Sequence, residues 1–423
     1  MRRPAEKLNK SNHKTAAAER ALEDAAFFLA PYPIRSDDAY RKRSLYQSIV
    51  QLTWPRAPIV QGVTTNGRIT ALDGWRGISI LCVVAAHLFG RRYSSHPDAD
   101  FPNIASVLSM WGVDIFFVIS GFIITRLALQ EYDAKGRFSI RDFYIRRLLR
   151  ILPPLYTYLL FILIASTSGY IVQTYSGIFS AAIFTCNFPN AQCGWFPGHS
   201  WTLAYEEQFY LVFPIIFFFF GRRVHVIAAA LFLFLMMFPF VRFFLRLGSL
   251  WREIAEFAPS FSFISGGVVL ATFEQKFVRL ISNQRAFYVS IPIYACLMVL
   301  LLSGSNVKFT PGSTGAYMQL GFTNCLLPIC FLWIIGSTAF RDTWIKRLLD
   351  HPCLQFFGKV SYSLYIWQMA FTAAPSLYLE RTWLLFSPLM LLMAALSYYL
   401  VERPSIRFGK HLLGGSRAMG STS

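Results

Sequence analysis

The chain has 423 residues, of which 55% are hydrophobic and 17% aromatic, with 40 Lys and Arg against 22 Asp and Glu. This composition is too apolar for a soluble domain and excludes that class. The net charge of +18 does not indicate a nucleic-acid-binding protein, because the basic residues are scattered between hydrophobic segments instead of forming one basic domain. We therefore predict an all-α, polytopic membrane protein.

The first 70 residues differ from the rest of the chain. They are polar and carry twelve Lys and Arg, and Arg2 and Arg3 are not followed by the apolar region of a cleavable signal peptide. We predict a basic cytoplasmic extension over 1–70, a transmembrane domain over 71–405 and a short cytoplasmic tail over 406–423. The extension shows no residues that indicate chemistry.

Hydrophobic segments of about 20 residues, the length that crosses a bilayer as a helix, follow the extension. We predict about ten transmembrane helices. They cover approximately 72–91, 107–127, 150–168, 202–220, 224–245, 255–273, 286–303, 317–338, 359–378 and 383–402. The apolar stretch 171–186 is interrupted by polar residues, which favours an interfacial or re-entrant piece.

Charges in the connecting segments predict the orientation. With the N-terminus in the cytoplasm, the inner loops and tail carry 20 Lys and Arg and the outer loops carry 7. Both termini are therefore expected in the cytoplasm. Cys186 and Cys193 then lie outside, where they either form a disulfide or remain free thiols. The cysteine spacing does not indicate a metal site, so no bound metal is expected.

The first segment places ionisable residues inside the membrane. Arg76 and His87 are eleven residues apart, which puts them on one helix face roughly 16 Å apart along the axis. Asp73 precedes them, where a carboxylate caps free N–H groups. His87 suits a general base because its pKa is near neutral, or else a helix-to-helix hydrogen bond. Arg76 alone would also fit an interfacial anchor.

Polar residues also interrupt the second segment. Asp114 is a lone acid in an apolar run, and Ser120 with Gly121 permits close approach of another helix. Asp114 either orients a polar partner or has a purely structural role.

Two charged pairs flank later segments. Arg147 and Arg150 share a helical face, which fits an anion clamp or a basic stop that sets the topology. Glu206 and Glu207 open the fourth segment and point about 100° apart, so only one of them faces a given site. Either could neutralise an arginine or orient a histidine.

Six strings, in order, resemble the integral-membrane acyltransferase 3 family. They are LDGWRGISILCVVAAH, GVDIFFVISGFIIT, RRLLRILPPLY, HSWTLAYEEQFYLVFP, SYSLYIW and VERP, within about residues 68 to 410. The family transfers acyl groups, often acetyl, from acyl-CoA to saccharides and other acceptors. The resemblance implies that His87 is the catalytic histidine and Arg76 its partner. It further implies that Arg147 and Arg150 are the arginine pair.

The resemblance extends to Glu206 and Glu207, which occupy the family's acidic pair. The chain departs from the commoner pattern at Gln368, where a histidine is frequent, so no role is expected for a second histidine there. From the motifs we expect acyl-CoA, in particular acetyl-CoA, as donor substrate and no permanently bound cofactor. The acceptor is expected to be a saccharide or glycolipid.

These features predict a multi-pass acyltransferase of the bacterial cytoplasmic membrane. His87 would deprotonate an acceptor hydroxyl for direct attack on the thioester, or carry the acyl group itself. The alternative is a transporter or flippase of a glycan or lipid-linked substrate. No internal repeat of the kind common in transporters is visible. The acceptor, the acyl chain, the side from which the acceptor enters and the oligomeric state stay open.

Overall fold

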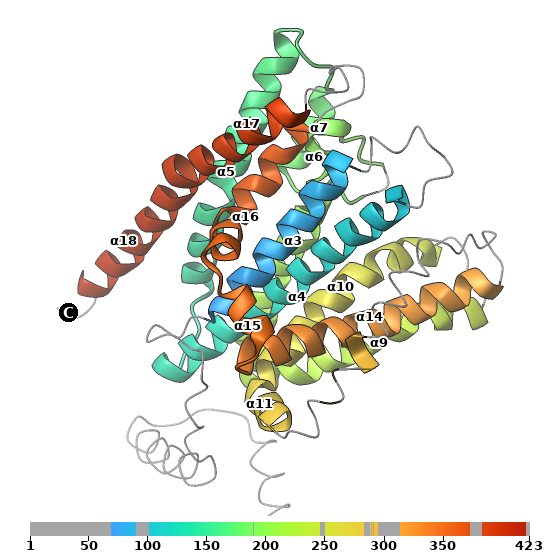
Figure 1. Ribbon diagram of the computed structural model, residues 1–423. Coiled ribbons are helices and arrows are strands. Elements are labelled where there is room, and N and C mark those ends of the chain that lie inside the picture. The colour runs from blue at the N-terminus through green and yellow to red at the C-terminus, as the bar shows by residue number, and fades with distance from the viewer. Residues whose placement is uncertain are drawn as a thin grey trace, which may run out of the picture. The chain divides into compact units, whose positions relative to one another are not determined.

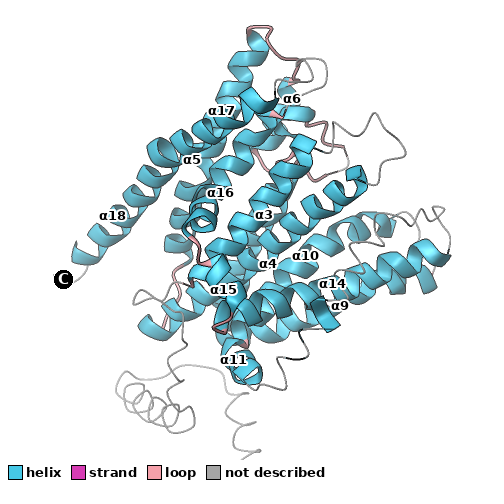
Figure 2. Ribbon diagram, viewed as in Figure 1, coloured by secondary structure: helices cyan, strands magenta, loops and turns pink. Residues whose placement is uncertain are grey.

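The computed structural model describes residues 69–89, 101–188, 190–245, 250–282, 314–372 and 383–419, with a few positions between 288 and 294. The chain divides into two units, 1–59 and 60–423, and all described residues belong to the second. The predicted extension over 1–70 thus lies almost wholly outside the described residues. Helices joined by short loops make up the described part (Figures 1 and 2). The fold class is all-α.

The helices have the following bounds. They are α3 (Thr70–Phe89), α4 (Phe101–Lys135), α5 (Ile140–Thr167), α6 (Tyr175–Ala182), α7 (Trp195–Gly198), α8 (Trp201–Phe220), η1 (Gly221–Arg223), α9 (Val224–Phe244), α10 (Leu250–Thr272), α11 (Glu274–Ser282), α14 (Thr314–Phe340), α15 (Trp344–Leu349), α16 (Pro352–Phe371), α17 (Trp383–Leu396), η2 (Ser397–Glu402) and α18 (Arg403–Met419).

Four helical stretches of the described chain are long and apolar enough to cross a bilayer. They are Thr70–Leu88, Val107–Lys135, Ile140–Thr167 and Trp201–Phe238. Helices α10 and α11, which meet at 77°, add a fifth if they form one broken span. These helices make the chain a multi-pass membrane protein. The number of ten spans and the orientation of the termini stay predictions, and most of the predicted span 286–303 lies outside the described residues.

The predicted spans over 202–220 and 224–245 correspond to α8 and α9. Helix α8 runs in the same direction as α4, because Tyr205 contacts Phe117 and Phe217 contacts Tyr132. Helix α10 also runs in the direction of α4, as the pair Arg126–Glu274 and the contact of Gly121 with Ile264 show. Helix α9 runs against α10, because His225 contacts Phe273 and Phe238 packs on Ala258. The helical stretch Trp201–Phe238 therefore turns back at Gly221, whose φ is +51°, beside the arginines at 222 and 223.

Helices α3 and α16 lie side by side and run in the same direction (Figure 1). The backbone of Asp73 lies against Gly358, and Arg76 Nη2 donates to Ser361 Oγ over 3.0 Å. Because both residue numbers increase together, the helices are parallel. Small residues at the contact let the two backbones approach closely. Helix α3 also packs along α4, so it is enclosed between two long neighbours.

We expect Gly358→Ala to destabilise the protein. A Cβ at this position would meet the carbonyl of Asp73 closer than real Cβ contacts occur, so α3 and α16 must separate. Overpacking of this kind costs about 1–3 kcal/mol. Thermal unfolding of purified protein in detergent measures the effect. Gly198→Ala is the matched control, because nothing lies within 4 Å of a Cβ there; equal midpoints for the two variants would contradict the expectation.

The segment before α8 is fastened to the bundle. Cys186 and Cys193 form a disulfide, which closes the loop between α6 and α7. Tyr158 on α5 donates its hydroxyl hydrogen bond to the carbonyl of Phe196 over 2.9 Å. The apolar stretch predicted as an interfacial piece contains the short helix α6. Together these contacts fix the start of α8, where the predicted acidic pair lies.

Candidate active site

A pocket lies among α3, α4, α5, α8 and α16. Five of the predicted site residues line it: Arg76, Ser120, Arg147, Arg150 and Glu206. The first and the last of these residues, Arg76 and Glu206, are more than a hundred positions apart in the chain. We call this cavity the central pocket.

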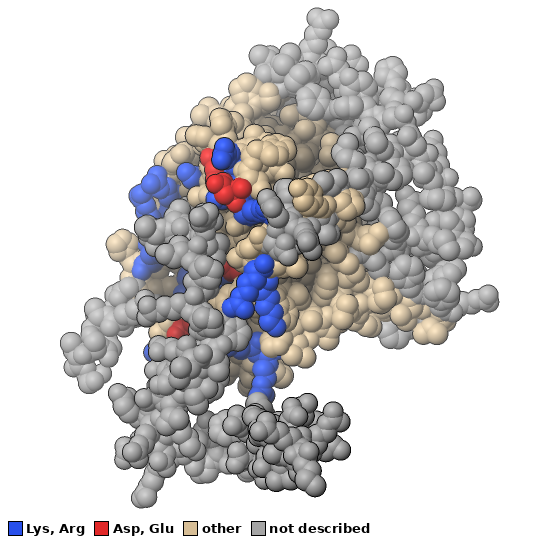
Figure 3. All heavy atoms as spheres, turned by 60° about the horizontal axis from the view of Figure 1, so that its bottom comes forward, with Lys and Arg blue, Asp and Glu red and all other residues tan. Residues whose placement is uncertain are grey.

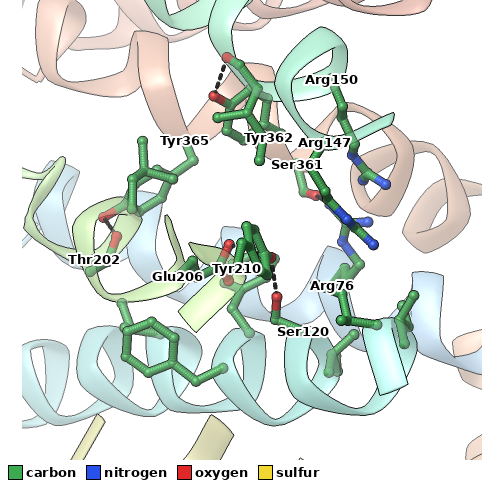
Figure 4. Close-up of a pocket in the computed structure, with 18 residues that line it drawn as sticks. Arg76, Ser120, Arg147, Arg150, Thr202, Glu206, Tyr210, Ser361, Tyr362 and Tyr365 are labelled. Atoms are coloured by element: carbon green, nitrogen blue, oxygen red, sulfur yellow. Dashed lines mark hydrogen bonds between the residues drawn. The ribbon is translucent and has the colours of Figure 1, made fainter. Parts of the chain in front are cut away.

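The basic residues gather on one side of the central pocket. Figure 4 shows the guanidinium groups of Arg76, Arg147 and Arg150 together there. The guanidinium of Arg76, on α3, is held by its hydrogen bond to Ser361 on α16. The guanidinium of Arg147 lies 5.2 Å from the ring centre of Tyr210, a cation–π contact. Three guanidinium groups in one cavity favour an anionic ligand.

The opposite side of the pocket is lined by hydroxyl groups and one carboxylate. Tyr210 OH donates to Glu206 Oε2 over 3.1 Å and shares a second hydrogen bond with Ser120 Oγ. Thr202 Oγ1 and Tyr365 OH are 2.6 Å apart (Figure 4). Glu206 therefore stands opposite the arginines and partly balances their charge.

A second cavity adjoins the first. Both cavities are lined by Arg76, Ile123 and Arg150, so they meet at these residues. Arg126 and Lys359 also line the second cavity, which we call the entry pocket. On the end of the molecule at the bottom of Figure 1, the described surface shows more Lys and Arg than Asp and Glu (Figure 3). Four basic side chains, Arg76, Arg126, Arg150 and Lys359, line the entry pocket against the two carboxylates of Asp73 and Glu402, and this excess of positive charge suits phosphate groups.

Glu402 is a residue of the entry pocket that the sequence did not assign to the site. It is only 1% exposed, accepts a hydrogen bond from Ser363 Oγ over 2.8 Å, and lies within electrostatic reach of Arg150 and Arg76. It ends the π-helical turn η2, and such turns are frequent at functional sites. The VERP string contains this residue, but its spacing could not show that it meets α3 and α5.

His87 lies apart from both pockets. It occupies the last turn of α3, and its Nδ1 is 2.8 Å from the carbonyl of Val83. Because a carbonyl only accepts, Nδ1 carries the hydrogen and Nε2 is the basic nitrogen. The carbonyl of Val83 is seven residues beyond Arg76, roughly 10 Å along the helix. The structure therefore separates His87 from the arginines by about two helical turns.

The other predicted residues are distributed as follows. Asp73 is buried and lines the entry pocket. Asp114 is buried on α4 but belongs to the lining of neither pocket. Glu207 is likewise outside both linings, as expected if only one carboxylate of the pair faces the site.

Comparison with known proteins gives the family. The family model described as "Acyltransferase domain", acyltransferase 3, matches residues 69–402. The chain belongs to the acyltransferase 3 family. No solved structure matches the chain. The match covers α3 to η2 and so includes every residue of the two pockets except Ile406, which lies just beyond it.

Two of the curated relatives are proteins of Staphylococcus aureus. A protein named "Putative O-acetyltransferase" in strain COL is 28% identical over 373 residues, which cover 79% of this chain and 57% of the relative. The O-acetyltransferase OatA of strain NCTC 8325 is 25% identical over 368 residues, with 79% and 57% covered. The chain thus spans little more than half the length of these relatives. It belongs to a family of membrane acyltransferases and is homologous to proteins named O-acetyltransferases.

Proposed function

We propose that the chain transfers an acyl group, in particular acetyl, from acyl-CoA to a hydroxyl of a saccharide or glycolipid. The observation that carries this proposal is the junction of the two pockets at Arg76 and Arg150. Basic side chains line the entry pocket and its junction with the central pocket, and beyond the arginines the central pocket is lined by apolar side chains and hydroxyl groups. An acyl donor with a phosphorylated end and a long, uncharged arm fits this order of pockets, with the phosphates in the entry pocket and the arm in the central pocket.

The phosphates of the donor bind at the entry pocket, where Arg126, Arg150 and Lys359 supply charge. The pantetheine arm then extends through the central pocket toward Thr202 and Tyr365. Tyr365 is four residues, about 6 Å, beyond Ser361 on the helix that lies beside α3. This brings the thioester to within about one helical turn of the level of His87. The basic end faces the cytoplasm of a bacterial cell in this proposal, since acyl-CoA is made there.

His87 acts as the general base. Its Nε2 takes the proton of the acceptor hydroxyl while the hydroxyl oxygen attacks the thioester carbon. The carbon–sulfur bond breaks, and CoA leaves as a thiolate that is then protonated. Arg76 is about 10 Å from the thioester carbon and binds the polar part of acyl-CoA. The hydrogen bond that stabilises the oxyanion must therefore come from another residue.

Purified protein in liposomes with acetyl-CoA, labelled in the acetyl group, tests the proposal. Lipid extract of the producing cells and a panel of methyl glycosides serve as acceptors. We expect protein-dependent release of free CoA together with label in the lipid or glycoside fraction. A transporter would move solute without consuming acetyl-CoA, and intact acetyl-CoA with every acceptor would overturn the proposal.

A further inference from the structure

Gln368 on α16 has a buried side-chain amide that makes no hydrogen bond with the described residues. Its side chain is 0% exposed, and neither Nε2 nor Oε1 has a hydrogen-bond partner among the described residues. A buried amide without partners costs free energy, and such groups call for an explanation. By contrast, Gln355 on the same helix donates to the carbonyls of Thr70 and Leu349 over 2.8 and 2.9 Å. The amide of Gln368 is therefore not needed to hold α16 in place.

The register of α3 and α16 places Gln368 beside His87. The Arg76–Ser361 hydrogen bond shows that these two residues lie at the same height along the axes of the two parallel helices. Seven residues further on each helix are Val83, whose carbonyl accepts from the imidazole of His87, and Gln368. Seven residues advance both helices by roughly 10 Å and return to within about 20° of the same face. Gln368 thus lies on the face of α16 toward α3, at the level of the His87 ring.

Two other side chains, His199 and Trp367, also have buried nitrogen atoms without a hydrogen-bond partner in the described part of the chain. Both ring nitrogens of His199 and the indole nitrogen of Trp367 are buried without a hydrogen-bond partner of acceptable geometry among the described residues. The ring of His199 is 5.2 Å from that of Tyr365, and both His199 and Trp367 contact the ring of Tyr158. We call His199, Trp367 and Gln368 the Gln368 cluster.

Burial leaves the ring of His199 neutral. Its carbonyl accepts from Tyr365 OH over 2.7 Å, which fixes the backbone, and its ring lies close to the backbone of Phe196 and Ile366. Burial lowers the pKa of His199 to about 3, and the charge of His87 is a second cause. A neutral imidazole offers one donor and one acceptor. The cluster therefore presents hydrogen-bond donors and acceptors side by side. Each hydroxyl of a diol also donates and accepts a hydrogen bond, so the two hydroxyls complement the cluster.

We propose that the Gln368 cluster is the acceptor subsite, which binds the reacting hydroxyl of a carbohydrate and its neighbouring hydroxyl beside His87. This inference rests on the proposed function. Acyl-CoA approaches the cluster from the side of the central pocket. Thr202 and Tyr365 line that pocket, and Tyr365 lies one turn of α16 before Gln368. The atoms are closely enclosed, so the subsite takes hydroxyl-sized groups and not a whole sugar ring.

The variant Gln368→Leu tests the subsite, with acetyl-CoA and methyl glycosides as probes in liposomes. Loss of the amide should raise the KM for the glycoside by roughly 10- to 100-fold, since a site built to hydrogen-bond a hydroxyl depends on those bonds. The dissociation constant of CoA, measured by titration calorimetry, should stay within about twofold. Removing unpaired buried polar atoms should also raise the thermal midpoint of the ligand-free protein. Gln368→His, which retains a donor and an acceptor, should restore much of the KM.

Gln355→Leu is the matched control, because it removes a glutamine of the same helix that has two hydrogen bonds. It should lower the thermal midpoint and leave the KM for the glycoside close to that of the wild type. If Gln368→Leu instead lowers the midpoint and leaves the KM unchanged, the cluster is structural and the inference is wrong, while the proposed function stands. If the wild type consumes no acetyl-CoA with any acceptor, the proposed function fails first and the subsite with it.

Discussion

Replacing His87 by alanine should lower acyl transfer by about 10²- to 10⁴-fold, the usual contribution of a general base. The side chain is half-buried at the end of α3, and its Nδ1 is already engaged by the carbonyl of Val83. In the proposed mechanism Nε2 is the nitrogen that accepts the proton, so no other atom of the residue substitutes for it. The measurement is the initial rate of label transfer from acetyl-CoA in liposomes, at equal amounts of protein.

His225→Ala is the matched control for this substitution. The Nδ1 atom of His225 also contacts a backbone carbonyl, that of Arg222, over 2.7 Å, but the residue lies on α9 away from both pockets. We expect His225→Ala to retain the rate of the wild type. A rate for His87→Ala within threefold of the wild type, with the protein folded in the membrane, would remove His87 from the mechanism.

Replacing Arg150 by glutamine should raise the KM for acetyl-CoA by roughly 10- to 100-fold, because hydrogen bonds to charged groups contribute about 1.5–3 kcal/mol. Arg150 lines both pockets at their junction and faces Glu402. Its loss removes a cation from the path of the donor. Steady-state release of CoA at varied acetyl-CoA concentration gives the KM.

A neighbour on the same helix provides the comparison. Arg146 Nη2 pairs with Glu131 over 2.8 Å, and its side chain is exposed outside both pockets. Since exposed ion pairs contribute little, Arg146→Gln should change the KM by less than twofold. Equal effects of the two substitutions would mean that α5 supplies only diffuse charge and no specific donor site.

The sequence alone predicted the helical class, the location of most described helices and the charged residues of the central pocket. Hydrophobic length and period are local properties, so they could be read from the chain. Spacing also placed Arg147 with Arg150, and it indicated that Glu206 and Glu207 face different ways. The family was indicated by motifs such as LDGWRGISILCVVAAH, which the comparison confirmed.

Only the tertiary structure decided how these faces meet. The close contact at Gly358 sets the register between α3 and α16, and no local pattern encodes the level at which two distant helices touch. That register places Gln368 at the level of His87 and leaves His87 outside the pocket of the arginines. In the same way the turn η2 carries Glu402 to Arg150. Helical periodicity determines which side chains share a face, whereas packing between helices determines what that face meets.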